Sequence, residues 1–297
     1  AMAVGCWRLD AFNCGGGNAA IKFMSFAPSI FQILIAFATA LVISYLAWRM
    51  GSLSQSGALA ALVLGTLTMG IGLRFGGPAV LLGFFISGSL LSKRTAKLRP
   101  ESANIAAKSG PRDAWQVLAN GGVAGLSYLL LAFTGELIFA IAAAGSLAAA
   151  NADTWATELG AFSRQLPRSL RNGKLVDRGS SGAVSAIGLG SAAGGALLIA
   201  FLYVLTSMYY PSPLRLLGLL TLSGFLGTLL DSVLGATLQS VYFCPVCGSE
   251  TEKHPRHSCG NATEHSRGLS FMTNDWVNSL CTLSGAVLSC LFAYLWL

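Results

Sequence analysis

The chain reads ELIFAIAAAGSLAAAN from Glu136 to Asn151 and continues as ADTWATELG from Ala152 to Gly160. The first part is apolar over nearly its whole length, as a helix that crosses a membrane must be. The second part places Asp153 and Glu158 at the end of that apolar run. Only 10% of the 297 residues are charged, and a carboxylate beside a hydrocarbon core is costly. These two acids therefore indicate a functional site at a membrane border.

Similar apolar segments recur along the rest of the chain, which is typical of a membrane protein. Hydrophobic residues make up 54% of the sequence, and the mean hydropathy is +0.63. The 35 glycines fit this class, because small residues let helices approach closely inside a bilayer. We expect an all-α, Gly-rich polytopic bundle of about seven to eight transmembrane helices. The expected spans are Ser29–Trp48, Leu53–Leu73, Pro78–Leu91, Trp115–Phe133, Glu136–Asn151, Ala183–Met208, Leu214–Val241 and Trp276–Leu297.

Basic residues concentrate in three polar segments, residues 92–112, 164–178 and 244–267. Two spans separate each segment from the next, so all three lie on one side of the membrane, and the positive-inside rule makes that side cytoplasmic. This topology accounts for the net charge of +7, and no nucleic-acid partner is expected. We expect a poorly defined tail over residues 1–27 and one membrane domain over 28–297, with 244–267 as an inserted loop. The membrane is expected to be the cell membrane, or a plastid or other organelle membrane in a eukaryote.

Five acids lie where the expected spans meet the cytoplasmic side, and they predict one cytoplasm-facing pocket. Carboxylates at this depth need a partner, and clusters of carboxylate and amide oxygens suit Mg²⁺, with substrate phosphates completing its shell. The acids are Asp113, Asp153, Glu158, Asp231 and Asp275. Four amides either shape this pocket or only hydrogen-bond neighbouring helices. They are Asn120, Asn151, Asn274 and Asn278.

Two basic or small-residue segments beside these acids could hold phosphate. The residues after the third span, Lys93, Arg94 and Lys97, supply positive charge, although topology and contact with anionic lipids are the alternative explanation. The segment from Arg178 to Ala183 opens the sixth span, where free N–H groups at a helix start attract anions. Its two serines could instead only cap that helix. They are Ser180 and Ser181.

The third polar segment has the residues of a metal site. Cys244-Pro-Val-Cys247 is a knuckle of the kind that binds zinc, and Cys259 follows in the same loop. All three histidines of the chain, His254, His257 and His265, also lie there. Zn²⁺ takes four nitrogen or sulfur ligands, and a closed set of four indicates a structural role. The set predicted here is Cys244, Cys247, Cys259 and one histidine; His265 is the one chosen, His254 and His257 stay open, and free thiols or a disulfide are the alternative.

At these motifs the sequence resembles the transmembrane protein 19 family, which includes the phytyl-phosphate kinases of plants and cyanobacteria. The resemblance runs from about Ser52 to the C-terminus. The motifs that carry it are Ser54–Ala60, Gln116–Gly121, Ala152–Gly160, Gly179–Ser185, Asp231–Gln239 and Asn274–Asn278. The Cys/His loop is similar to a variant of prokaryotic members that animal members lack. This difference implies that zinc is accessory to the reaction.

The resemblance implies a kinase that uses CTP or another nucleoside triphosphate to phosphorylate an isoprenoid monophosphate of the phytyl or prenyl type. Such transfer depends on positioning and charge neutralisation. We therefore expect Asp153, Glu158 and Asp231 to bind Mg²⁺, and Asp275 to be a further ligand or the base that orients the acceptor. The lipid tail would stay in the bilayer. The residues expected to bind phosphate are Lys93, Arg94, Lys97, Arg178, Ser180 and Ser181.

Two other functions remain open from the sequence. Acids inside the membrane and helices broken by glycine also suit a transporter or an ion-coupled carrier. A carrier requires a polar path at the middle of the bilayer, whereas the polar residues here gather at one side and no clear inverted repeat is detectable. A non-catalytic scaffold would leave the acids without a role.

Overall fold

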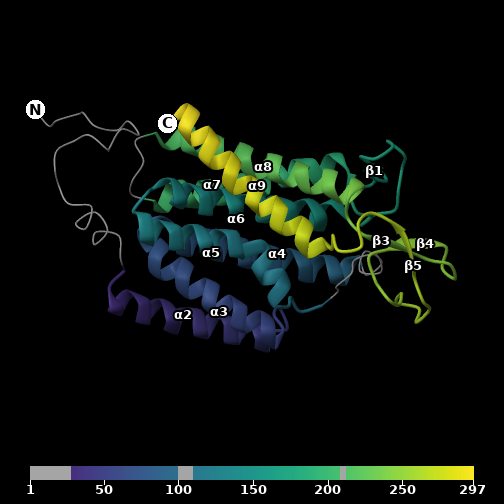
Figure 1. Ribbon diagram of the computed structural model, residues 1–297, viewed down its shortest axis with the longest axis horizontal. Helices are drawn as coiled ribbons and strands as arrows, with labels where there is room; N and C mark the ends of the chain where they lie inside the picture. The colour runs from purple at the N-terminus through teal and green to yellow at the C-terminus, as the bar shows by residue number, and fades with distance from the viewer. Residues whose placement is uncertain (1–27, 100–109, 208–211) are drawn as a thin grey trace, which may run out of the picture.

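The computed structural model describes residues 28–99, 110–207 and 212–297, so the expected tail of residues 1–27 lies outside the described residues. In this part of the chain, eight long helices form a bundle, and two small sheets lie at one end of it (Figure 1). A 3₁₀ turn, η1 (Gly72–Arg74), follows the second helix of the series. The helices are α2 (Ile30–Arg49), α3 (Gln55–Ile71), α4 (Gly77–Leu98), α5 (Ala114–Thr134), α6 (Ile138–Gly160), α7 (Ala186–Thr206), α8 (Pro213–Thr237) and α9 (Asn274–Trp296).

Each of the eight expected spans contains a long helix, which confirms the polytopic helical class. The expected start of the sixth span at Ala183 and the expected end of the seventh at Val241 are wrong, because Ala183 and Val184 form a strand ahead of α7, and Val241 begins a strand after α8 ends at Thr237. The expected end of the sixth span at Met208 lies outside the described residues. Six helices are long and apolar enough to cross a membrane: α2, α3 extended through η1, α5, α7, α8 and α9. The other two, α4 and α6, carry polar residues in their last turns. The expected end of the third span at Leu91 is wrong, because α4 continues through the basic residues to Leu98. Similarly, α6 continues past Asn151 through both acids to Gly160.

The centre of the bundle is α6, which contacts α4, α5, α7, α8 and α9. Every residue of α6 from Ala140 to Ala152 is buried, and most of them are alanine. Alanine and glycine leave room for close helix contacts. At the contact with α9, a Cβ added to Gly145 would lie 2.5 Å from the carbonyl oxygen of Gly285, closer than any real Cβ contact. The small residues therefore fix α6, and with it the acids at its end.

Replacing Gly145 with alanine is expected to destabilise the bundle. The added methyl group forces α6 and α9 apart, and such overpacking costs about 1–3 kcal/mol. In detergent, we expect a melting temperature lower by several degrees. The matched control is Gly190→Ala on α7, where a Cβ meets nothing within 4 Å. That change should be neutral or slightly stabilising, because alanine favours helix over glycine. Equal melting temperatures for the two variants would contradict the tight α6–α9 contact.

The two sheets lie in the polar segments between helices. Strands β1 (Arg168–Ser169) and β2 (Ala183–Val184) pair before α7. Between α8 and α9, β3 (Val241–Cys244), β4 (Ser249–Thr251) and β5 (Glu264–Arg267) form an antiparallel sheet in the order β4-β3-β5. The membrane part is helical as expected, while the Cys/His loop, residues 244–267, contributes to a three-stranded sheet.

The three basic segments meet at the same end of the bundle. Thr95, near the end of α4, donates a hydrogen bond to the carbonyl of Glu158 on α6 (3.2 Å). Ser181, before α7, donates to the carboxylate of Glu252 in the Cys/His loop (2.6 Å). The C-terminus of the chain lies at the opposite end of the bundle (Figure 1). This arrangement agrees with the topology predicted from the distribution of positive charge.

Candidate functional site

Two carboxylates meet at the polar end of the bundle. The side chains of Asp153 on α6 and Asp231 on α8 share a hydrogen bond. Two ionised carboxylates that are close enough to share a hydrogen bond repel each other unless a proton or a cation lies between them. The second oxygen of Asp231, Oδ2, is buried and has no hydrogen-bond partner among the described residues. A buried acceptor without a partner is costly, so this oxygen is a candidate ligand atom.

The close contact between α6 and α8 brings these two acids together. One and two turns before Asp231, α8 has Gly227 and Gly224, which face alanines of α6; a Cβ on either glycine would lie 2.8 Å from an alanine Cβ. Between them and the acid, Thr228 donates a hydrogen bond to the carbonyl of Ala149 (3.3 Å). The glycines thus let the helices approach, and the acids follow at the end of the contact.

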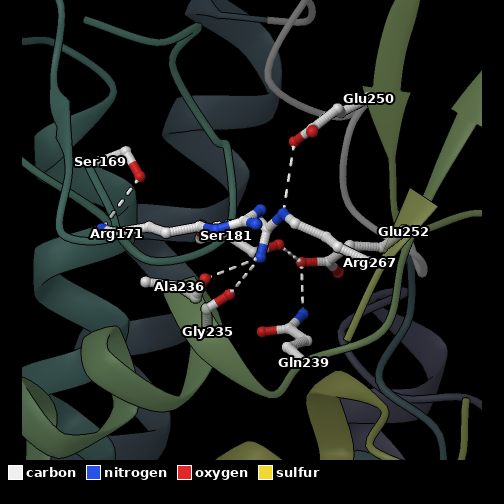
Figure 2. Close-up of polar contacts among 9 residues, drawn as sticks. All are labelled: Ser169, Arg171, Ser181, Gly235, Ala236, Gln239, Glu250, Glu252 and Arg267. Atoms are coloured by element: carbon white, nitrogen blue, oxygen red, sulfur yellow. Dashed lines mark hydrogen bonds and ion pairs between the residues drawn. The ribbon is translucent and has the colours of Figure 1, made fainter. Parts of the chain in front are cut away.

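A third carboxylate, Glu252, approaches this pair from the Cys/His loop. Its negative charge acts on both Asp153 and Asp231. Its Oε1 atom accepts hydrogen bonds from Ser181 Oγ (2.6 Å) and Gln239 Nε2 (2.6 Å) (Figure 2). Glu252 was not predicted as a site residue, because an acid in a polar loop does not stand out in the sequence as one inside an apolar run does.

Glu158, the third expected Mg²⁺ ligand, turns to a different neighbour. It lies five residues after Asp153, so the two side chains point about 140° apart around the helix. Glu158 Oε1 accepts a hydrogen bond from Ser92 on α4 (2.5 Å), and Ser92 Oγ also accepts one from Arg112 Nη2 (3.4 Å). The negative charge of Glu158 still acts on Asp153, but not detectably on Asp231. Glu252, in contrast, acts on both aspartates.

Arg112 is the basic partner of Glu158 and was not among the predicted site residues. Burial lowers the pKa of Arg112 from its usual value, and the negative charge of Glu158 opposes that shift. The same arginine lines a cavity of about 80 Å³ between α2, α3, α4 and α5, together with Gln116 and Asn120. Arg112 thus connects the polar end of the bundle to a mostly apolar cavity.

The predicted amides and the remaining acids have different positions. Asn151 is fully buried, donates to Gly195 on α7 (2.8 Å) and accepts from Ser87 on α4 (3.0 Å), so it joins three helices. Asn120 donates to the carbonyl of Gln116 (2.9 Å) and lines the cavity. Asp113 caps α5. Three residues lie in the first two turns of α9: Asn274, Asp275 and Asn278.

The predicted phosphate-binding residues are only partly available for a ligand. Lys93, Arg94 and Lys97 are exposed on the last turns of α4, although Lys93 also donates to the carbonyl of Met50 (3.1 Å). The side chain of Arg178 is used locally, because its Nε and Nη2 atoms donate to the carbonyls of Ser163 and Arg164 (3.1 and 3.2 Å).

Neither Ser180 nor Ser181 caps α7. The cap is Ser185, whose hydroxyl accepts from the backbone N–H of Gly188 (3.0 Å), because β2 separates the two earlier serines from the helix. The expected position of these two serines at the start of the helix is therefore wrong. Ser181 instead donates to Glu252.

The Cys/His loop brings four metal-binding side chains together. Ligand atoms of Cys244, Cys247, His257 and Cys259 all lie within 4.8 Å of one another. The prediction of His265 as the fourth ligand is wrong. His265 lies on β5, and its ring packs edge-on against that of Tyr242, with 5.6 Å between the ring centroids. None of these three cysteines forms a disulfide. Hydrogen bonds from the side chain and backbone of Asn261, and from His257, lower the pKa of Cys259 to about 5.

The helices and this polar end define a multi-pass integral membrane protein with a candidate site at one membrane border. The model of the family described as integral membrane protein DUF92 matches residues 38–286, and the chain belongs to that family.

Curated relatives are found in plants, archaea and cyanobacteria. Protein PGR of Arabidopsis thaliana is 28% identical over 276 residues, which cover 85% of this chain and 93% of that protein. An uncharacterized membrane protein of Methanocaldococcus jannaschii is 33% identical over 54% of this chain and 64% of its own length. An uncharacterized membrane protein of a Synechocystis species is 34% identical over 55% of this chain and 64% of its own length. No solved structure shows a significant match.

Proposed function

We propose that the protein is a membrane-embedded kinase that transfers a phosphoryl group from CTP or another nucleoside triphosphate to an isoprenoid monophosphate. The observation that carries this proposal is the contact between Asp153 and Asp231. The buried Oδ2 atom of Asp231 has no hydrogen-bond partner among the described residues. The reaction itself comes from the resemblance to the transmembrane protein 19 family and its phytyl-phosphate kinases. The location at a membrane border suits a substrate with a lipid tail and a charged head.

The donor atoms of the pair fit a divalent cation. Mg²⁺ prefers oxygen ligands, usually one or two carboxylates together with substrate phosphates. Asp153 and Asp231 would hold the ion, and Glu252 lies close enough to act on both. A bound Mg²⁺ would neutralise charge on the nucleotide phosphates. The partnerless Asp231 oxygen supports this fit, because a cation would satisfy it.

Phosphoryl transfer in this setting needs no general base. An oxygen of the acceptor's phosphate attacks the γ-phosphorus, the bond from that phosphorus to the β,γ-bridging oxygen breaks, and the nucleoside diphosphate leaves. The attacking oxygen is already ionised, so the protein has to bind, orient and neutralise charge. Lys93, Arg94 and Lys97 would attract the anionic substrates. Asp275 stays a proposed group for orienting the acceptor.

The structure does not favour the carrier alternative. A carrier requires polar groups along a path through the membrane. In the described core, α6 is buried and built mainly of alanine from Ala140 to Ala150, and the acid pair lies only at its polar end. An acid pair at one side of the membrane suits an enzyme that receives its nucleotide from the cytoplasm.

The proposal is tested by incubating the purified full chain in nanodiscs with γ-labelled CTP, ATP, GTP or UTP, Mg²⁺ and a panel of prenyl monophosphates. We expect label to appear in a lipid diphosphate with at least one nucleotide, and to disappear when EDTA removes the divalent cation. Absence of labelled lipid across the whole panel, with protein that is folded and monodisperse, would contradict a kinase acting on this substrate class.

A further inference from the structure

The four clustered side chains of the Cys/His loop match the needs of zinc. Three sulfurs and one imidazole nitrogen form a complete set of four ligands, as structural zinc sites have. The sulfurs of Cys244 and Cys259 lie 3.7 Å apart, and His257 Nδ1 lies 3.3 Å from the Cys259 sulfur. The sulfur separation is close to that of a filled tetrahedral site, because Zn–S bonds of about 2.3 Å place sulfurs slightly under 4 Å apart.

The same loop carries Glu252 between its metal-binding residues. Cys244 ends β3, and Cys247 lies in the turn that leads to β4. β4 ends at Thr251, immediately before Glu252. On the other side of Glu252, the ammonium of Lys253 donates to the hydroxyl of Ser258 (2.7 Å), which stands between His257 and Cys259. The position of Glu252 is therefore tied to the cluster on both sides.

The sheet of the Cys/His loop is anchored on the end of α8. Arg267 on β5 donates to the carbonyl oxygens of Gly235 and Ala236 (3.1 and 3.0 Å) and of Ser181 (3.3 Å) (Figure 2). Carbonyls in the last turn of a helix lack partners within the helix, and a positive charge is favourable there. This anchor and the two hydrogen bonds to Glu252 place the loop directly against the polar end of the bundle.

We propose that a Zn²⁺ ion held by Cys244, Cys247, His257 and Cys259 fixes the Cys/His loop so that Glu252 completes the divalent-cation site of Asp153 and Asp231. The inference rests on the proposed function only in taking that acid pair as a cation site. It changes the role expected from the sequence, since the metal is structural but the loop that it holds supplies a residue to the site.

The physical reason is that Arg267 and the two hydrogen bonds to Glu252 join the loop to the bundle, whereas zinc would hold the short strands and turns of the loop to one another. Its three strands have three to four residues each, and a sheet of this size has little stability of its own. In small metal-binding units, the binding of zinc supplies the free energy of folding. Without zinc, we expect the position of Glu252 to be less fixed, because the hydrogen bonds from Ser181 and Gln239 would then hold a residue of a less ordered loop. The loss of an ordered group around a metal typically lowers affinity by roughly 10- to 100-fold.

The first experiment measures zinc in purified full-length protein by elemental analysis. We expect one zinc per chain in the wild type and a large loss in His257→Gln. The control is His265→Gln, which changes the histidine that packs on Tyr242 and should keep its zinc. Wild-type protein without zinc after expression and purification in zinc-containing medium, or zinc lost from His265→Gln and kept by His257→Gln, would overturn the assignment.

The second experiment measures Mn²⁺ affinity by electron paramagnetic resonance, with no substrate present. Zinc-depleted protein and zinc-loaded Glu252→Gln should both bind Mn²⁺ roughly 10- to 100-fold more weakly than the wild type. Zinc-loaded Glu264→Gln is the control, because Glu264 is exposed on β5 of the same sheet. Unchanged Mn²⁺ affinity in Glu252→Gln or after zinc depletion would overturn the coupling. Since this readout needs no turnover, a failed kinase assay leaves it intact, and the two proposals fail separately.

Discussion

Replacing Asp153 with asparagine is expected to reduce nucleotide-dependent phosphorylation of the lipid substrate by at least about 100-fold while leaving the protein folded. The change removes one of the two carboxylates that face each other between α6 and α8. Asparagine keeps the shape of the side chain but binds a cation weakly. The labelled-lipid assay measures the loss, and size-exclusion chromatography and a melting curve measure the fold.

The stability of this variant provides a second readout. Without a bound cation, two neighbouring carboxylates repel each other or must share a proton. The amide that the substitution introduces could donate a hydrogen bond to Asp231 without that repulsion. We therefore expect cation-free Asp153→Asn to be as stable as the wild type or more stable. The control is Asp177→Asn, a change in the polar segment between α6 and α7. Full activity in Asp153→Asn would remove Asp153 from the site.

The second large effect concerns Arg112 and Glu158, which belong to different segments of the chain and are connected through Ser92. Replacing Glu158 with glutamine leaves the largely buried guanidinium of Arg112 without its negative neighbour. Removing one partner of a buried ion pair typically lowers the free energy of unfolding by about 3–5 kcal/mol. Because this pair lies at the edge of the bundle, within reach of water, we expect a smaller loss of about 1–3 kcal/mol. The melting temperature of Glu158→Gln should fall by several degrees.

A double-mutant cycle separates this interaction from other effects of the two changes. Because Arg112→Gln/Glu158→Gln removes both charges, it should be more stable than the sum of the two single changes predicts. Arg171→Gln, an exposed position, is the control for loss of a surface charge. Strictly additive single changes would mean that Arg112 and Glu158 do not interact.

The apolar segments predicted the helices correctly, because a span must be apolar over most of its length whatever its neighbours are. Their ends were predicted less well. Helix α4 continues beyond Leu91 into a basic segment, since a helix inside a protein can extend past the hydrocarbon when another element, here the end of α6, packs against it. Hydropathy alone contains no signal for such an extension.

The site was predictable only where helical spacing or apolar surroundings restrict it. The convergence of Asp153 and Asp231 was expected from topology. The separation of Glu158 from Asp153 was also predictable, since residues five apart lie on different faces of a helix. The position of Glu252 and the choice of His257 over His265 depend on how a short sheet folds, and the spacing of residues along the loop does not determine that.

The central claim is that Asp153 and Asp231 bind a divalent cation together. The most direct measurement is anomalous diffraction from crystals of the full chain grown with Mn²⁺ and a non-hydrolysable nucleotide analogue. We predict an anomalous peak within ligand distance of both carboxylates, which disappears in Asp231→Asn. A peak bound only by other residues, with the two aspartates still joined by a hydrogen bond, would contradict the claim.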